Sequence, residues 1–576
     1  MTELKSTLQT PSNLQLDERE GPISWERIIK IFNWNKGGSY NLAAEAVDRH
    51  IAEGFGGKIA LRYVDESRDF TWTFLQLAHR VDYWMNRFLS FEIQKGDRVF
   101  IFLPRVPDLY AAILGAIKMG AIAGPLFEAF YADALRDRLG DCGAKLLVTT
   151  PELAQRVPRE DLPHLRQIIL LEDLFPEVES NPQTKPLQAV NMDPDDGLII
   201  HYTSGSTGKP KGILHAHRAM IQHAATGRWV LDLRDDDLYW CTAHPGWVTG
   251  SSYGVFAPWL NRATILINGG RFDALTWIRL LKKTGVTVLY SAPTVFRMIM
   301  ATPPEAFQKL QHRLRHVLSV GEPLNPEVIE WGWKTLGVRI HDTWWMTETG
   351  AQLIVNLSHQ TIRLGSMGKP LPGIEAAILD DSLLEVPRGE LGQLAIKTPW
   401  PSLMKTVWNN PQKYASYFTE VKNRGVFYLS GDTARMDEDG YVYFIGRGDD
   451  VIVTSGEKVS PFEVESTLIT HSKVAEAGVI AKPDPIRGDI VKAFVVLRDG
   501  VQASGELARE IRDFVKTRLS AHAYPREVEI VAALPKTRGS GKIMRRVLKA
   551  WETGGDIGDT TTLENGQRII LANSND

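Results

Sequence analysis

Residues 202–212 carry the groups that could bind a polyphosphate. They read Tyr-Thr-Ser-Gly-Ser-Thr-Gly-Lys-Pro-Lys-Gly and follow a short apolar run at residues 198–200. Glycines let backbone N–H groups come close to a ligand, and hydroxyl groups and lysines add donors and positive charge. A surface turn of similar composition is the alternative, but the hydroxyl groups and lysines after a predicted buried strand favour a phosphate-binding loop. The predicted contacts are Thr203, Ser204, Gly205, Ser206, Thr207, Gly208, Lys209 and Lys211.

The spacing of this loop excludes a P-loop. That motif needs Gly-x-x-x-x-Gly-Lys followed by Ser or Thr. Here Gly205 and Gly208 are too close together, and Pro210 follows Lys209. The segment is therefore a phosphate-binding loop of another class.

A second candidate segment lies at residues 342–350, which read Asp-Thr-Trp-Trp-Met-Thr-Glu-Thr-Gly. The Thr347 hydroxyl beside the Glu348 carboxylate suits a phosphate oxygen and Mg²⁺, a hard cation that takes few protein carboxylates and keeps several waters. The tryptophans alone could be core residues. Three other segments, at residues 321–323, 428–432 and 535–546, could each be an ordinary turn when taken alone. Their order along the chain makes them informative.

The elements that must position these segments alternate between short apolar strands and helices. Such alternation predicts a mostly parallel α/β sheet. Residues 213–221, directly after the phosphate loop, are expected to begin a helix. Strands are expected near residues 98–103, 121–126, 145–149, 263–267, 286–290 and 316–320, and helices near residues 74–88, 107–119 and 275–283.

The pattern of expected strands and helices changes twice further along the chain. From about residue 375 the expected strands are short and separated by turns, which is typical of a small antiparallel subdomain. Ser460, Pro461 and Glu463 then form a good helix start. We expect an N-terminal domain at residues 1–448, a small domain at residues 449–552 and a polar tail at residues 553–576.

Composition limits the class of protein. The 576 residues have a formal net charge of −3, which argues against a dominant nucleic-acid surface. Cys142 and Cys241 lie too far apart for a metal-binding or disulfide pattern, so a reducing cytoplasm is expected. No signal peptide is seen. The apolar residues 109–127 contain Lys118 and several glycines, and they predict a helix followed by a buried strand, not a membrane span.

Together these segments resemble the adenylate-forming superfamily, which includes acyl-CoA synthetases, luciferases and the adenylation domains of peptide synthetases. The resemblance covers residues 200–546. It implies ATP, Mg²⁺ and coenzyme A as ligands, a large α/β N-terminal domain and a small mobile α+β C-terminal domain.

The resemblance also implies a role for each segment. Thr347 would contact the α-phosphate and Glu348 would hold Mg²⁺. Lys542 would be the catalytic lysine that bridges the carboxylate and the α-phosphate, because attack of one anion on another needs a cation to offset the growing charge. Gly539 makes this lysine loop one residue longer than the usual pattern. The implied adenine and ribose contacts are Gly321, Glu322, Pro323, Asp342, Thr343, Trp344, Trp345, Met346, Asp432, Arg447 and Lys458, with Asp449 as the hinge.

Within the superfamily the chain resembles the AMP-forming acetyl-CoA synthetases. Trp345 stands where an indole closes the acyl pocket behind the acetate methyl group, and Met346 stands where glutamine is common. Small pockets discriminate weakly between neighbouring chain lengths, so propionate is a second expected substrate. The implied acyl-pocket residues are Trp247, Val248, Thr249, Val320 and Trp345, and the implied coenzyme A contacts are Arg138 and Gly456.

These implications predict a ligase that makes acyl-AMP from ATP and a carboxylate and then transfers the acyl group to coenzyme A. Alternatives are a synthetase for propionate, butyrate or isobutyrate, and a stand-alone adenylation enzyme that loads a carrier protein. A non-catalytic nucleotide-binding protein is disfavoured, since a pure binder does not need the lysine loop. A lysine acetyltransferase and a deacetylase are possible partners at Lys542, and neither a nucleic-acid nor a membrane partner is expected.

Overall fold

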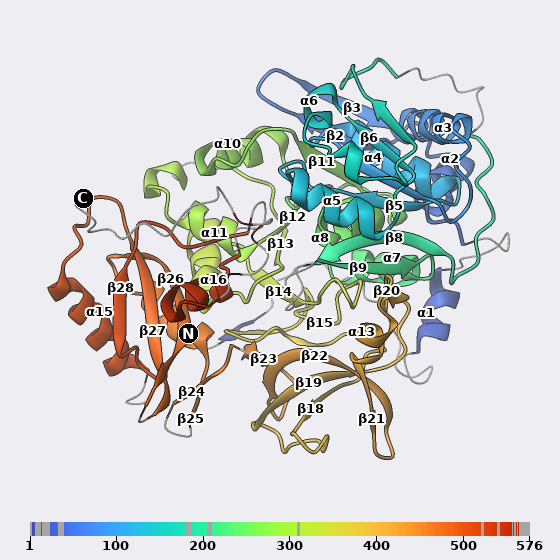
Figure 1. Ribbon diagram of the computed structural model, residues 1–576. Coiled ribbons are helices and arrows are strands. Elements are labelled where there is room, and N and C mark those ends of the chain that lie inside the picture. Colours follow the sequence, from blue (N-terminus) through green and yellow to red (C-terminus); the bar gives the residue numbers. More distant parts are fainter. Residues whose placement is uncertain are drawn as a thin grey trace.

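The structure is a computed structural model (Figure 1). It describes residues 3–5, 13, 24–32, 40–178, 186–203, 210–307, 311–448, 450–454, 457–485, 487–519, 523–537, 542–555, 557, 560 and 563.

Two large sheets form the bulk of the chain before residue 375. In the first, the strands from β14 to β2 run parallel, while β3, β15 and β17 are antiparallel to their neighbours. Its strands, in spatial order, are β17 (Lys369–Pro370), β15 (Ile354–Val355), β14 (Ile340–Trp344), β13 (His316–Ser319), β12 (Val288–Ser291), β10 (Leu238–Cys241), β11 (Thr264–Asn268), β2 (Ile59–Val64) and β3 (Asp69–Thr73).

The second large sheet is parallel from β8 to β7 and ends in two antiparallel strands, β9 and β20. The predicted parallel α/β architecture is therefore confirmed. The strands, in spatial order, are β20 (Thr406–Val407), β9 (Lys211–Ala216), β8 (Gly197–Thr203), β5 (Ile122–Pro125), β4 (Arg98–Phe102), β6 (Leu146–Thr149) and β7 (Gln167–Leu170).

Helices lie between and around these sheets. None of the helices in the described parts of the chain is long and apolar enough to cross a membrane. They are α1 (Trp25–Phe32), α2 (Arg49–Ala52), α3 (Phe74–Ser90), α4 (Pro107–Lys118), α5 (Ala132–Asp141), α6 (Pro151–Ala154), α7 (Ala219–Trp229), α8 (Val248–Ser251), α9 (Ala257–Leu260), α10 (Ala274–Thr284), α11 (Pro293–Met300), α12 (Pro326–Trp331), α13 (Pro411–Ala415), α14 (Pro461–Ile469), α15 (Gly505–Arg518) and α16 (Arg545–Thr553).

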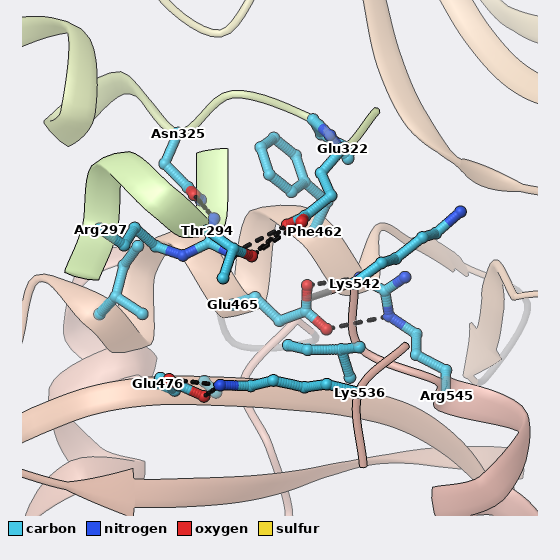
Figure 2. Close-up of a pocket in the computed structure, with 14 residues that line it drawn as sticks. Thr294, Arg297, Glu322, Asn325, Phe462, Glu465, Glu476, Lys536, Lys542 and Arg545 are labelled. Carbon is cyan, nitrogen blue, oxygen red and sulfur yellow. Dashed lines mark hydrogen bonds and ion pairs between the residues drawn. The ribbon is translucent and has the colours of Figure 1, made fainter. Parts of the chain in front are cut away.

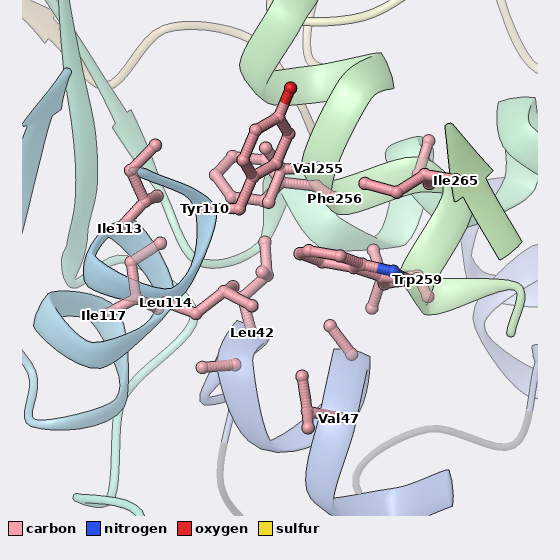
Figure 3. Close-up of a cluster of buried hydrophobic side chains, with 14 of the residues drawn as sticks. Leu42, Val47, Tyr110, Ile113, Leu114, Ile117, Val255, Phe256, Trp259 and Ile265 are labelled. Carbon is pink, nitrogen blue, oxygen red and sulfur yellow. The ribbon is translucent and has the colours of Figure 1, made fainter. Parts of the chain in front are cut away.

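The largest apolar core lies where the two sheets share helices. Every residue of α4 is buried, and its apolar side chains pack with residues of both sheets. Figure 3 shows Ile113, Leu114 and Ile117 of α4 in the same buried cluster as Leu42 and Trp259. Apart from Asp108 and Lys118, α4 is apolar on all sides, as is typical of a helix buried inside a protein rather than lying on its surface.

The change of pattern near residue 375 corresponds to a separate antiparallel sheet (Figure 1). The residues after 450 form a further, mixed sheet, in which the last strand pairs parallel with its neighbour. The first sheet contains β18 (Ala376–Leu379), β19 (Leu391–Lys397), β22 (Gly425–Met436), β21 (Phe418–Val421) and β23 (Val442–Arg447). The second contains β25 (Glu457–Val459), β24 (Ile452–Thr454), β27 (Gly488–Leu497), β26 (Val474–Asp484) and β28 (Glu527–Ile530). A small pair joins β1 (Glu3–Leu4) to β16 (Ile362–Arg363). The division at residue 448 stays a prediction.

One expected helix start is wrong. Residues 211–216 form β9, which pairs antiparallel with β8, and the helix begins only at Ala219. The phosphate loop therefore connects two adjacent strands. An apolar run of this length fits a buried strand and a helix equally well, so periodicity could not decide between them. The predicted helix start at Ser460 is correct, and its side chain accepts a hydrogen bond from Glu463 N–H.

A buried ion cluster ties α4 to its surroundings. Lys118 is fully buried, and its ammonium group lies 2.6 Å from Asp82 of α3 and 2.9 Å from Asp48. Burial raises the pKa of Asp48 to about 6, although the Lys118 charge acts in the opposite direction. Lys118 therefore favours the ionised form of Asp48 and pairs at the same time with Asp82.

We predict that Lys118→Met lowers the free energy of unfolding by about 3–5 kcal/mol at pH 8, because two buried carboxylates lose their cation. Without the cation the pKa of Asp48 in the folded state rises further above its unfolded value. The folded state then binds extra protons as the pH falls, so the loss should shrink toward pH 5.5. Urea unfolding of the wild type and the variant at pH 8 and pH 5.5 measures this loss in the free energy of unfolding.

The matched control is Lys95→Met. Lys95 pairs with Asp196 at 2.6 Å, but its side chain is 44% exposed, and an exposed pair contributes about 1 kcal/mol or less. Equal losses for the two variants would contradict the assignment of Lys118 as a core cation.

Candidate active site

The candidate site lies where strand ends of the two large sheets meet the antiparallel sheet. Lys211 begins β9, Glu348 follows β14, and Asp432 lies on β22. Ligands of parallel α/β sheets bind beyond the carboxyl ends of the strands. The fold therefore brings together residues that lie more than two hundred positions apart in the chain.

Lys211, Tyr417 and Glu348 form a connected group. The Lys211 ammonium donates to the Tyr417 hydroxyl at 2.8 Å, and this hydroxyl donates to the Glu348 carboxylate at 3.0 Å. Lys211 Nζ also lies 3.9 Å from the same Glu348 oxygen. Burial lowers the pKa of Lys211, an effect that Glu348 partly offsets, and burial raises the pKa of Tyr417. The group holds a cation and an anion at fixed positions where β9 begins.

The backbone around Glu348 is held by a neutral histidine. His215 Nε2 lies 2.9 Å from the Thr347 carbonyl oxygen. Burial lowers the pKa of His215 to about 4. The ring is therefore neutral at pH 7, and the proton must sit on Nε2 for it to donate to the carbonyl group.

The predicted ribose contacts lie side by side. Arg447 donates to one oxygen of the Asp432 carboxylate at 2.8 Å, and the Trp344 indole donates to the other at 2.8 Å. Asp432 is 4% exposed, while the Arg447 side chain is 45% exposed. A carboxylate fixed in this way can accept further hydrogen bonds from a pair of hydroxyl groups.

Gly321 and Glu322 follow β13 and form the opposite side of the site. Gly321 has φ of +90°, and a Cβ added there would meet no atom within 4 Å. The glycine is therefore required by the backbone conformation, and it leaves open space in front of the chain. The Glu322 carboxylate accepts hydrogen bonds from Thr294 at 2.7 Å and Arg297 at 2.9 Å.

Asp342 is a buried carboxyl group at the end of the first sheet. Burial raises its pKa to about 7, although hydrogen bonds from the backbone N–H groups of Thr343 and Leu324 act in the opposite direction. Near neutral pH this group is a mixture of its two protonation states. It can therefore act either as a donor or as an acceptor at the edge of the site.

Lys542 lies in a cavity between the two parts of the chain (Figure 2). The cavity is lined on one side by Glu322 and Pro323 and on the other by Lys542 and Arg545. By its accessible surface, Lys542 is exposed. The surrounding cleft nevertheless desolvates its ammonium group, and this lowers the pKa of Lys542. The positive charges of Arg447 and Arg545 add to that effect. The ammonium group is thus placed among the residues of the predicted nucleotide site.

The residues of the predicted acyl pocket fall into two groups. Val320 and Trp345 belong to one buried cluster, and Val248 packs against it. Trp247 instead packs on Phe127, with ring centroids 5.8 Å apart, in a neighbouring cluster. Val320 and Trp345 thus belong to the large core cluster on which Val248 packs, whereas Trp247 packs on a neighbouring cluster.

Trp345 is fixed from two sides. Its indole N–H donates to the Tyr290 hydroxyl at 3.1 Å, and its ring meets that of Tyr253 edge to face at 5.1 Å. It is 8% exposed. A ring held in this way forms a rigid wall that cannot swing aside at low cost.

Several predicted residues are not tested by this geometry. Arg138 is 1% exposed and stacks on Phe130 at 4.3 Å, so this arrangement does not present it to a ligand, and its coenzyme A role stays a prediction. For Lys458 only the backbone, in β25, is described. The predicted residues Ser204, Gly205, Ser206, Thr207, Gly208, Lys209, Asp449, Gly456 and Gly539 lie outside the described residues.

The sequence analysis missed Tyr417, Arg297 and Asn325. No motif marks them, since each is an ordinary residue of its own segment. Their importance comes from hydrogen bonds to residues far away in the chain, such as the contact of Tyr417 with Lys211 across 206 positions. Sequence reasoning on a single chain has no signal for such contacts.

Comparison with known proteins identifies the family of this architecture. The family model of the AMP-binding enzymes matches residues 48–408, and that of the AMP-binding enzyme C-terminal domain matches residues 463–542. An acetyl-coenzyme A synthetase of Bacillus subtilis (strain 168) is 54% identical over 563 residues, which is 94% of this chain and 97% of the relative. An acetyl-coenzyme A synthetase of Rubrobacter xylanophilus is 40% identical, covering 94% of this chain and 89% of the relative.

Solved structures agree with this result. An acyl-CoA synthetase of Brucella canis is 36% identical with a TM-score of 0.68, covering 92% of this chain and 97% of that one. The anthranilate CoA ligase AuaEII in complex with anthranoyl-AMP is 28% identical with a TM-score of 0.79, and the match covers 93% of this chain and 99% of that one. The chain therefore belongs to the AMP-binding enzyme family, as both its N-terminal and its C-terminal segments show.

Proposed function

We propose that this protein is an AMP-forming acetate–CoA ligase. It converts ATP, acetate and coenzyme A into acetyl-CoA, AMP and diphosphate through acetyl-AMP. The observation that carries the proposal is the position of Lys542, which shares one cavity with Glu322 and Pro323 (Figure 2). The similarity to acetyl-coenzyme A synthetases over nearly the whole chain supports the same reaction.

In the first half-reaction an acetate oxygen attacks the α-phosphorus of ATP, and diphosphate leaves. The attack brings two anions together, so fixed cations lower its barrier. Lys542 offsets the charge between the carboxylate and the α-phosphate, and Lys211 offers a second cation beside the phosphates. Asp432 and Arg447 hold the ribose.

Glu348 is the residue that would hold Mg²⁺. Mg²⁺ usually takes only one or two protein carboxylates together with substrate phosphates and waters. A single carboxylate, oriented by Tyr417 and placed beside the Thr347 hydroxyl in the chain, fits that demand. The bound cation would neutralise charge on the departing diphosphate.

In the second half-reaction the thiol of coenzyme A attacks the carbonyl carbon of acetyl-AMP, and AMP leaves. Lys542 must then leave the cleft, so the C-terminal domain rotates about Asp449 and brings the segment around Gly456 to the site. Arg138 is proposed to contact coenzyme A only if this rotation opens its surroundings.

Trp345 supports a short acyl chain. Its ring belongs to the same buried cluster as Val320, and its contacts with Tyr290 and Tyr253 oppose its moving aside. A longer carboxylate would overlap this wall. Synthetases for propionate, butyrate or isobutyrate, and a carrier-loading enzyme, remain the alternatives that the following measurements separate. A cytoplasmic location, and an acetyltransferase and a deacetylase acting on Lys542, stay predictions.

We predict that diphosphate release, measured with ATP, Mg²⁺ and coenzyme A over acids from formate to hexanoate, peaks at acetate or propionate. Trp345→Gly should raise the rate with hexanoate by about tenfold or more, because each accommodated methylene contributes roughly 1–3 kcal/mol. A wild-type peak at butyrate or beyond would contradict the role of Trp345. Formation of acyl-AMP without any coenzyme A-dependent turnover would indicate carrier loading.

We predict that Lys542→Ala lowers the rate of acetyl-AMP formation by about 10²–10³, as expected for loss of a group that stabilises developing charge. The variant should still convert supplied acetyl-AMP and coenzyme A into acetyl-CoA. The matched control is Lys536→Ala, which removes a lysine of the same loop that pairs with Glu476. Equal loss in both half-reactions would argue against a role in adenylation alone.

We predict that Tyr417→Phe lowers the rate of acetyl-AMP formation by about tenfold, because Lys211 and Glu348 lose the hydroxyl that links them. The Mg²⁺ concentration needed for half-maximal rate should rise as well. Tyr414→Phe is the control, since the Tyr414 ring packs on Phe418 at 4.9 Å on the same segment. An unchanged Mg²⁺ requirement in Tyr417→Phe would contradict the link to Glu348.

A further inference from the structure

A hydrogen bond joins the nucleotide side of the cavity to the C-terminal part of the chain. Asn325 Nδ2 donates to the Ser466 hydroxyl at 2.7 Å. Asn325 follows the Gly321–Pro323 segment and is 3% exposed, while Ser466 lies on α14. A hydrogen bond made by such a buried amide has a fixed geometry and little competition from water.

The Asn325 amide is itself oriented by the nucleotide side. Arg297 donates to Asn325 Oδ1 at 3.0 Å, and this fixes which end of the amide faces Ser466. The same guanidinium group donates to Glu322 at 2.9 Å and to Thr294 at 2.7 Å. Figure 2 shows these side chains grouped on one wall of the cavity. The amide is therefore part of one rigid group with Glu322, the residue next to Gly321.

On the other wall, α14 is coupled to the lysine loop. Glu465, the neighbour of Ser466, is buried and binds the Arg545 guanidinium through both carboxylate oxygens, at 3.0 and 2.5 Å. It also accepts a hydrogen bond from Val479 N–H of β26 at 2.8 Å. Arg545 lies three residues after Lys542 and begins α16. The position of α14 thus sets the position of the loop that carries Lys542.

We propose that Asn325 and Ser466 form a latch that positions Lys542 for adenylate formation and that opens before thioester formation. The assignment rests on the proposed two-step function. Both latch residues are positioning residues, because neither is placed against the reacting atoms. The latch is a neutral hydrogen bond, which is strong enough to select one arrangement and weak enough to break in each turnover.

The test compares the two half-reactions in Asn325→Ala, Ser466→Ala and the double variant. Acetate-dependent exchange of diphosphate into ATP measures adenylation, and supplied acetyl-AMP with coenzyme A measures thioester formation. Each single variant should slow exchange by about three- to tenfold, the range expected for one hydrogen bond, and leave thioester formation unchanged or faster. The double variant should be no slower than the single variants, because the two residues form one contact.

The matched control is Thr467→Ala, which removes the next hydroxyl on the same helix. Thr467 donates to the Glu463 carbonyl inside α14 and should leave both half-reactions unchanged. Equal slowing of both half-reactions, no slowing of exchange, or multiplication of the two single effects would overturn the latch while the wild type remains an acetate-activating enzyme. If the wild type activates no carboxylate at all, the proposed function is overturned, and the latch with it.

Discussion

The chemistry of this site requires that negative charges meet at one point, and the structure is arranged around that electrostatic constraint. The polyphosphate, the carboxylate and the Glu348 side chain are all anionic. In the proposed mechanism Lys211, Arg447 and Lys542 supply the opposing charge, and they come from β9, β23 and the segment after β28. Buried cations lose hydration, which is why burial lowers the pKa of Lys211. Keeping a buried cation from a close ion pair with a neighbouring carboxylate until a ligand binds therefore requires a neutral group between the two charges.

Tyr417 and Asn325 are such neutral groups. Tyr417 lies between Lys211 and Glu348 and shares hydrogen bonds with both, so the ion pair itself stays at 3.9 Å. Asn325 lies between Arg297 and Ser466 in a similar way. A direct, fully formed salt bridge between Lys211 and Glu348 would compete with the ligand for the cation. Arg297 already pairs with Glu322 at 2.9 Å, and Asn325 joins that pair to the neutral Ser466 hydroxyl. A neutral hydrogen-bonding partner keeps the charge in position and leaves it able to bind a phosphate or to move away.

The residue pattern predicted the fold class and the order of elements, because short apolar strands that alternate with helices leave few alternatives. It failed at residues 213–216, where a buried strand and a helix have the same composition. For the site, Lys211, Asp432 and Arg447 could be predicted, since each belongs to a segment with a recognisable sequence pattern. Tyr417, Asn325 and Glu465 could not, since their roles depend on contacts made only after the sheets have come together.

The core around α4 and the cavity around Lys542 are held together by different kinds of contact. The core around α4 is apolar and contains Lys118 only as a fully paired ion, so it has a single stable arrangement. Nine of the fourteen residues that line the cavity around Lys542 are charged or polar, and the bond from Asn325 to Ser466 links its two sides. Apolar burial would make such an interface permanent, because its free energy grows with the area removed from water. A polar interface can exchange its hydrogen bonds for water, so the contact seen here is compatible with the proposed rotation, in which the C-terminal part delivers Lys542 and then withdraws it.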